Sequence, residues 1–130
     1  MSFYSIISSE DINFFLEKTN ALHDGYFIRV QYVNDAITNI DENGHYINPD
    51  AKKLILRILV TSIYNSIVEI EFDGVVEWKI IDNQMDITDT SIIFDEKNHI
   101  VWSDDCFINM TELKQGSYVI ANSMKWRIVE

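Results

Sequence analysis

The densest apolar stretch of the chain, residues 54 to 81, constrains the fold more than any other segment. Apolar and acidic residues alternate along its middle: Val68, Ile70 and Phe72 against Glu69 and Glu71. A period of two residues is typical of a strand that buries one face and leaves the other in water. This stretch therefore predicts a half-buried sheet.

An Asp73-Gly74 dipeptide follows that strand and is a strong hairpin signal, because it lies between two alternating runs. A two-residue loop would set Glu77 opposite Ile70 on the apolar face. We therefore predict a bulged or three-residue connection over Asp73, Gly74 and Val75, with Gly74 at positive φ. The predicted register pairs Phe72 with Val76, Ile70 with Trp78 and Val68 with Ile80.

Residues 54 to 60 are expected to form the preceding strand, with one apolar and one mixed face, as in a strand that is covered on both sides. The alternative is a helix over residues 49 to 64 that begins at Asn48-Pro49. The many β-branched residues and the adjacent hairpin signal favour the strand.

Composition bounds the class of protein. At 130 residues, of which 47% are hydrophobic, the chain is expected to form a single domain with one core. The formal net charge of −11 disfavours nucleic acid and anionic lipid as partners. A lone Cys106, the absence of a signal-peptide pattern and the absence of an apolar run of about 20 residues indicate a cytoplasmic protein outside the membrane.

The remaining segments predict one helix and several further strands. Ser8 and Ser9 before two acids form a helix start, and apolar residues at helical spacing extend the helix over residues 9 to 21. The strand at residues 26 to 33 is expected to face the core with Tyr26, Ile28, Val30 and Tyr32. Further elements are a small hairpin turning at residues 42 to 45, strands at residues 87–94 and 99–103, and a short strand or buried turn at residues 106–110.

The final strand, after Gln115-Gly116, carries a row of large side chains interrupted by Asn122. Its predicted inner face holds Tyr118, Ile120, Asn122, Met124, Trp126 and Ile128. Together these elements predict an α+β fold, in which the N-terminal helix packs on a mostly antiparallel, twisted sheet of six to eight strands. The sheet is expected to curl into a partial barrel or a sandwich.

Several short motifs resemble those of a known group of proteins: Leu22-His23-Asp24-Gly25, Glu71-Phe72-Asp73-Gly74-Val75, Ala121 and Lys125-Trp126-Arg127. With the N-terminal helix, this layout resembles small uncharacterised bacterial proteins, some of which are regarded as immunity proteins that neutralise toxins encoded beside them. The resemblance implies a compact α+β protein that acts by binding, without catalysis. It carries over no functional residue.

Residues that bear chemistry occur singly or in turns. His23 and Asp24 are interpreted as a helix end and a turn, and the calcium-loop pattern that begins at Asp41 fails because Lys52 replaces the closing acid. Cys106 is interpreted as a small buried hydrophobe, since no activating motif surrounds it. The loop aspartates are interpreted as turn residues, with a divalent-ion site as the alternative: Asp82, Asp86, Asp89, Asp104 and Asp105.

The function that this reading favours is a non-catalytic acidic binding protein of the immunity type, monomeric or homodimeric, without metal or cofactor. Its basic toxin partner would be met by Asp41, Glu42, Tyr46, Asp104 and Asp105. The alternatives are a structural domain, a metal-dependent hydrolase using Asp86 and Asp89, and a β-rich carrier of a small ligand. The carrier's aromatic pocket would be lined by Phe72, Trp78, Trp102, Tyr118 and Trp126.

Overall fold

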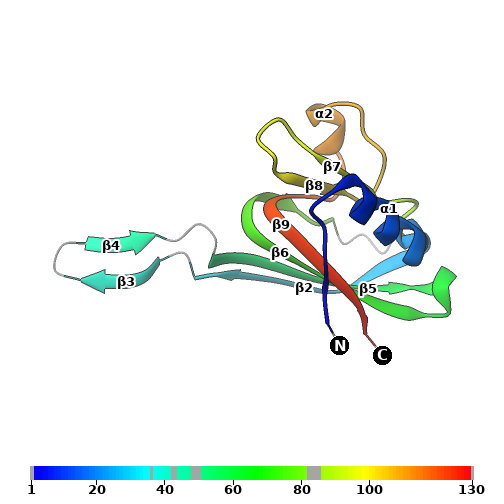
Figure 1. The fold of residues 1–130 in the computed structure, drawn as a ribbon, viewed down its shortest axis with the longest axis horizontal. Coiled ribbons are helices and arrows are strands. Elements are labelled where there is room, and N and C mark those ends of the chain that lie inside the picture. The colour runs from blue at the N-terminus through cyan, green and yellow to red at the C-terminus, as the bar shows by residue number, and fades with distance from the viewer. Residues whose placement is uncertain (1, 36, 42–43, 48–50, 82–85, 130) are drawn as a thin grey trace.

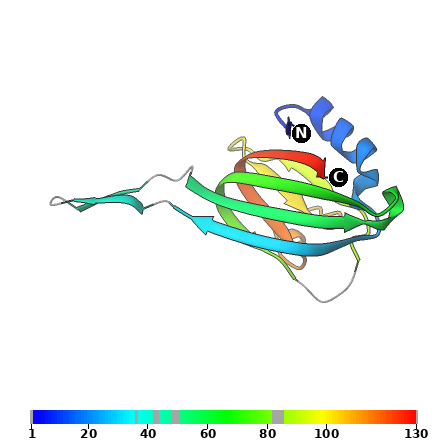
Figure 2. The same cartoon turned by 90° about the horizontal axis from the view of Figure 1, so that it is seen from below.

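The computed structural model describes residues 2–35, 37–41, 44–47, 51–81 and 86–129. Within them, the chain is an α+β protein in which helix α1, Ser9–Lys18, packs with a twisted, unclosed antiparallel sheet of seven strands (Figures 1 and 2). The sheet contains β1 Tyr4–Ser5, β2 Gly25–Asn34, β5 Lys52–Val60, β6 Ser66–Lys79, β7 Ser91–Phe94, β8 Ile100–Ser103 and β9 Tyr118–Val129. The predicted fold class is thereby confirmed.

The strand order is β2-β5-β6-β9-β8-β7, and β1 pairs with the C-terminal half of β9. The two ends of this order approach each other at one point, where an isolated bridge joins Gly25 to Ile87. A separate two-stranded sheet, β3 Ile37–Asp41 with β4 Gly44–Ile47, extends away from the main sheet (Figures 1 and 2). Its strands fit the predicted small hairpin, whose turn at residues 42 and 43 lies outside the described residues.

Helix α1 begins as its sequence predicts. Ser8 is the N-cap, and its hydroxyl accepts a hydrogen bond from the Asp11 backbone N–H, while the Asp11 carboxylate accepts one from the Ser8 N–H. The buried face of the helix carries Ile12 and Phe15. After a short 3-10 turn, η1 (Asn20–Leu22), the chain enters β2.

The predicted hairpin at Asp73 and Gly74 is wrong. Residues 66 to 79 form one continuous strand, β6, and Ile70 pairs with Trp126 of β9 rather than with Trp78. The other predicted pairs fail in the same way, since Phe72 pairs with Met124 and Val68 with Ile128. The alternative of a helix over residues 49 to 64 is also wrong, because residues 52 to 60 form strand β5, which pairs with β6.

Gly74 does adopt the predicted positive φ, at 65°, but within a strand. A Cβ built there would lie 2.4 Å from the Asn122 side chain of β9, so only glycine fits the close approach. The inner face of β6 passes from Phe72 to Val75 across this point. The inner face of β9 likewise passes from Ala121 to Met124, with Asn122 and Ser123 both exposed between them.

This corner corrects the predicted inner row of the final strand. Met124, Trp126 and Ile128 do face the main core, but Tyr118 and Ile120 lie in a second apolar cluster. Because the strand bends opposite Gly74, the alternation changes phase at Asn122, and a single row cannot run through it. Sequence alternation alone does not reveal where that phase changes.

The predicted inner face of β2 is right for Val30 and Tyr32, which pair with the buried Leu56 and Leu54 of β5, and wrong for Tyr26 and Ile28. All four side chains are at least 39% exposed. A register shift between Phe27 and Arg29 changes the alternation, so Phe27 packs on the core through Trp102 instead. β2 is moreover an edge strand, which leaves even the side chains over its inner face half covered.

The main core fills the concave side of the sheet and is closed at one end by α1 (Figure 2). On the opposite face of β8 and β9, Val101, Leu113, Tyr118 and Ile120 form the second cluster under the one-turn helix α2, Met110–Leu113. The sheet face around β6 carries ion pairs, in which buried Glu69 accepts hydrogen bonds from Arg57 and Arg127.

Candidate functional site

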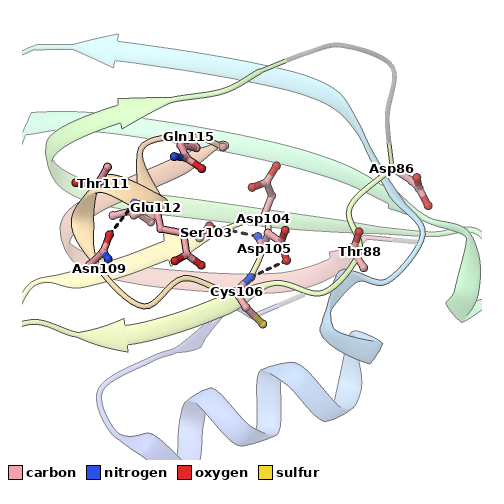
Figure 3. A pocket seen from close by; sticks show the side chains of 12 residues that line it. Asp86, Thr88, Ser103, Asp104, Asp105, Cys106, Asn109, Thr111, Glu112 and Gln115 are labelled. Atoms are coloured by element: carbon pink, nitrogen blue, oxygen red, sulfur yellow. Dashed lines mark hydrogen bonds between the residues drawn. The ribbon is translucent and has the colours of Figure 1, made fainter.

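An open cavity of about 820 Å³ lies where the loop after β8 faces α2 and the segment before β7 (Figure 3). We call it the acidic cavity, because four carboxylates line it: those of Asp86, Asp104, Asp105 and Glu112. No lysine, arginine or histidine is among the described residues that line it. The other lining residues are Thr88, Ser103, Cys106, Asn109, Thr111, Leu113, Gln115 and Gly116.

Asp104 is held by hydrogen bonds to the backbone of Ser117, the residue that precedes β9. Its N–H donates to the Ser117 carbonyl oxygen at 3.1 Å, and its Oδ1 accepts the Ser117 N–H at 3.1 Å. Gly116 makes this packing possible, since a Cβ there would lie 2.8 Å from Asp104 Oδ1. The carboxylate is thereby fixed against the cavity wall.

The environment of Asp104 opposes its negative charge. Burial is the main cause that raises its pKa above the ordinary 3.8; the backbone N–H of Ser117 works in the opposite direction, and the neighbouring Asp105 charge adds to the rise. A positive charge that approaches such a carboxylate stabilises its ionised form, because the cation offsets both the desolvation and the like-charge repulsion.

Asp105 and Cys106 form the tip of the same loop. The Asp105 N–H donates to Ser103 Oγ at 3.2 Å, and Asp105 Oδ1 accepts the Cys106 N–H at 2.7 Å (Figure 3). Cys106 is exposed, so the prediction of a buried hydrophobe is wrong. The loop turns at Asp104 and Asp105 on side-chain hydrogen bonds, which leaves the thiol outside the core.

The prediction of a short strand or buried turn at residues 106 to 110 is also wrong, since the segment is not a strand and most of it is exposed. This segment is a loop that leads into α2, whose N-cap Asn109 accepts the Glu112 N–H through Oδ1 at 2.9 Å. Two large apolar side chains on either side of the cavity-lining Asn109 in the chain are exposed, Ile108 at 89% and Met110 at 48%. Sequence reasoning missed Asn109 and Glu112, although Asn followed three residues later by Glu is a helix-start signal.

Contacts on the far side of the sheet hold α2 in place. Leu113 is buried in the second apolar cluster, and Lys79 Nζ donates to the Lys114 carbonyl oxygen at the end of the helix. The Tyr118 hydroxyl donates a hydrogen bond to the Glu77 carboxylate. Burial is the larger cause and the Glu77 carboxylate the smaller one that raise the pKa of Tyr118 to about 12. The cavity wall therefore rests on β6 and β9.

The aspartates of the proposed divalent-ion site are divided by the structure. Asp86, Asp104 and Asp105 line the cavity, whereas Asp89 Oδ1 lies 3.7 Å from His23 Nδ1 and Asp82 lies outside the described residues. Among the residues that the structure describes, no group of three acids, histidines or cysteines has the geometry to hold a metal ion.

His23 forms a contact between the start of β2 and the segment before β7. Its Nδ1–H donates to the Thr88 carbonyl oxygen at 2.5 Å, and its Nε2 lies 3.6 Å from Asp24 Oδ1. The Thr88 carbonyl is the main cause that raises the pKa of His23, followed by the Asp24 charge and, more weakly, the charges of Asp89 and Asp86. The hydrogen bond from His23 therefore fixes the segment that contains Thr88 and Asp86, two residues that line the cavity.

The predicted partner-binding residues fall in two places. Asp104 and Asp105 line the acidic cavity. Asp41 and Tyr46 belong to β3 and β4, which extend away from the main sheet, and Glu42 lies outside the described residues.

The predicted aromatic pocket residues lie in different environments. Phe72, Trp102 and Trp126 are buried in the main core, with the Phe72 and Trp102 ring centres 6.2 Å apart. Trp78 packs at the edge of that core against Tyr32, and Tyr118 belongs to the second cluster on the other face of the sheet. These five side chains therefore do not enclose one shared pocket.

No described helix has the length and apolar character needed to cross a membrane. A scan against protein-family models and searches of curated proteins and of solved structures found no match to this chain. A function for this chain is therefore inferred from the arrangement of its own side chains.

Proposed function

We propose that the chain is a non-catalytic binding protein of the immunity type, which neutralises a basic protein toxin by receiving it at the acidic cavity. The observation that supports this most is the cavity itself. Four carboxylates line it without a basic residue among its described lining, and exposed Ile108 and Met110 flank its lining residue Asn109 in the chain. A surface of one charge sign favours a partner of the opposite sign, and exposed apolar side chains beside it supply area that a partner can bury.

In this proposal the charge and the apolar residues have separate roles. The net charge of −11 speeds the encounter with a basic partner. A lysine or arginine side chain of the toxin then enters the cavity and pairs with Asp104 and Asp105. Ile108 and Met110 lose their exposed surface against the partner and slow its dissociation.

The hairpin of β3 and β4 supplies a second contact in the same proposal, through Asp41, Glu42 and Tyr46. The hairpin extends away from the main sheet (Figure 1), so a partner that contacts both it and the cavity has to span the distance between them. This second contact extends the interface beyond the cavity and makes it specific.

Co-expression with the product of the adjacent gene tests the proposal. We expect a stable complex that co-purifies and rescue of cell growth from that product's toxicity. The double variant Asp104→Asn, Asp105→Asn should weaken the complex by about two orders of magnitude, since each of the two charged pairs is expected to contribute about 1.5 kcal/mol. Glu96→Gln, an exposed acid in the turn between β7 and β8, is the matched control and should bind like the unaltered chain.

Absence of both complex and rescue would reject the immunity role. A complex that tolerates the double variant but not changes at Asp41 and Tyr46 would keep the role and move the interface to the hairpin. Binding of a small molecule in place of a protein at the cavity would favour a carrier instead.

A further inference from the structure

A second concave site lies between helix α1 and the strands β1 and β9. This groove, which we call the aromatic groove, has a volume of about 310 Å³ and is lined by Tyr4, Phe14, Lys18, Trp126 and Ile128. It shares no lining residue with the acidic cavity.

Three aromatic rings form the groove. The ring centre of Tyr4 lies 4.9 Å from that of Trp126 and 5.3 Å from that of Phe14, and those of Phe14 and Trp126 are 5.9 Å apart. Trp126 is 1% exposed and makes the floor, whereas Tyr4 and Phe14 are 53% and 37% exposed and make the walls. Exposed rings around a buried one offer flat apolar surfaces for a ring or a short alkyl chain.

The walls are held by regular structure. β1 pairs with β9 through Tyr4 and Trp126, and Phe15 of α1 packs on Trp126 with ring centres 5.1 Å apart. Lys18 lies one helical turn after Phe14 in α1, and its Nζ is 5.8 Å from the centre of the Phe14 ring. The groove is therefore formed before any ligand arrives, which limits the entropy lost on binding.

The charge at the groove differs from that of the chain as a whole. Lys18 forms no ion pair with any residue that the structure describes, whereas the nearby cations of β9 pair with acids: Lys125 with Glu71, and Arg127 with Glu69. A cation that has no carboxylate partner in the described part of the chain, at the rim of an apolar groove, complements a ligand that carries one negative charge.

We propose that the aromatic groove binds a small organic carboxylate that carries a single ring system or a short alkyl chain. Its apolar part lies between Tyr4 and Phe14 over Trp126, and its carboxylate pairs with Lys18 Nζ. The volume of the groove suits a molecule of this size rather than an extended peptide.

Titration of the full ¹⁵N-labelled chain with indole-3-acetate, followed by amide and indole N–H chemical shifts, tests this assignment. We expect saturable shifts at groove residues and at the Trp126 indole, with a dissociation constant of about 1 mM for a ligand of this size. The neutral analogue indole-3-acetamide should bind about five-fold more weakly, since it lacks the ion pair.

Two variants separate the roles of charge and rings. Lys18→Gln should abolish the preference for the carboxylate over the amide, and Phe14→Leu should weaken both ligands alike. Lys97→Gln, an exposed lysine in the turn between β7 and β8, is the control and should keep the preference.

No saturable shift up to roughly 10 mM, ten times the expected dissociation constant, would overturn the assignment. So would a preference for the carboxylate that survives Lys18→Gln, or saturation only by a peptide that ends in an aromatic residue. The result does not depend on the toxin partner, because the two sites have no residue in common.

Discussion

The acidic cavity and the aromatic groove are built in opposite ways. Loops and a one-turn helix form the cavity, and polar backbone contacts hold its carboxylates in place. The groove lies between a helix and two strands, and its floor, Trp126, is also part of the main core.

The difference teaches where function is separable from stability. A side chain that is part of the core cannot be altered without cost to the fold, whereas a loop carboxylate such as Asp104, whose burial disfavours its charge, costs stability while it is ionised. We therefore expect changes at the groove floor to destabilise the protein and neutralisation of Asp104 to leave it as stable or make it more so.

The largest expected effect is that of Trp126→Ala, which joins the loss of the groove to the loss of core packing. Removing a fully buried ring should lower the free energy of unfolding by about 3–5 kcal/mol. Urea denaturation measures it, and Trp126→Phe should lose clearly less. A loss below about 1 kcal/mol would show that the groove floor is independent of the core.

Gly74→Ala alters the corner of β6 that separates the two sites. The positive φ of 65° and the 2.4 Å approach to Asn122 should make this change cost about 1–3 kcal/mol in the free energy of unfolding. Thermal unfolding measures the loss, and Val76→Ala, at an exposed neighbouring position, serves as the control. If both variants unfold alike, the corner carries no special strain.

Asp104→Asn sharpens the comparison, since it should raise stability at pH 7 by up to about 1 kcal/mol while weakening the proposed complex. Because the folded pKa of Asp104 is raised, its contribution is favourable below the ordinary 3.8 and is lost as pH rises through the folded pKa. At pH 7 the ionised carboxylate therefore opposes folding. A variant that melts lower than the unaltered chain at pH 7, in scanning calorimetry, would contradict this.

The smallest expected effect concerns His23, beside the cavity wall. Its folded pKa is raised, so the protonated form favours folding fully below pH 6.5, and this stabilisation is lost as pH rises through the folded pKa. The melting temperature should fall slightly across that window. His23→Gln should remove this dependence, and an unchanged slope in the variant would assign it to another group.

Sequence patterns predicted much of the framework. The N-cap at Ser8, the strand predicted at residues 54 to 60, the positive φ of Gly74 and the α+β class all follow from local propensity and from the period of apolar residues. Of the candidate site, Asp104 and Asp105 were named from their charge and loop position.

Pairing between distant strands was not predictable in the same way. Asp73-Gly74 reads as a hairpin turn in sequence, yet β9 offers β6 a longer partner that lies some 50 residues further along the chain. Bulges at Ile28 and near Gly74 shift the alternation, so the inner faces of β2 and β9 differ from those that a strict period of two predicts.

By itself, the sequence determined that the N-terminal segment is helical and that the longest apolar segments are extended, because apolar periodicity, caps and glycine act on neighbouring residues. Tertiary structure alone decided that β6 continues through its glycine, that Asp86 and Glu112 line the same cavity as Asp104, and that Tyr4 and Phe14 stand over Trp126. These outcomes depend on which strands pair and where the sheet bends, and the free energy that selects them comes from contacts between residues far apart in the chain.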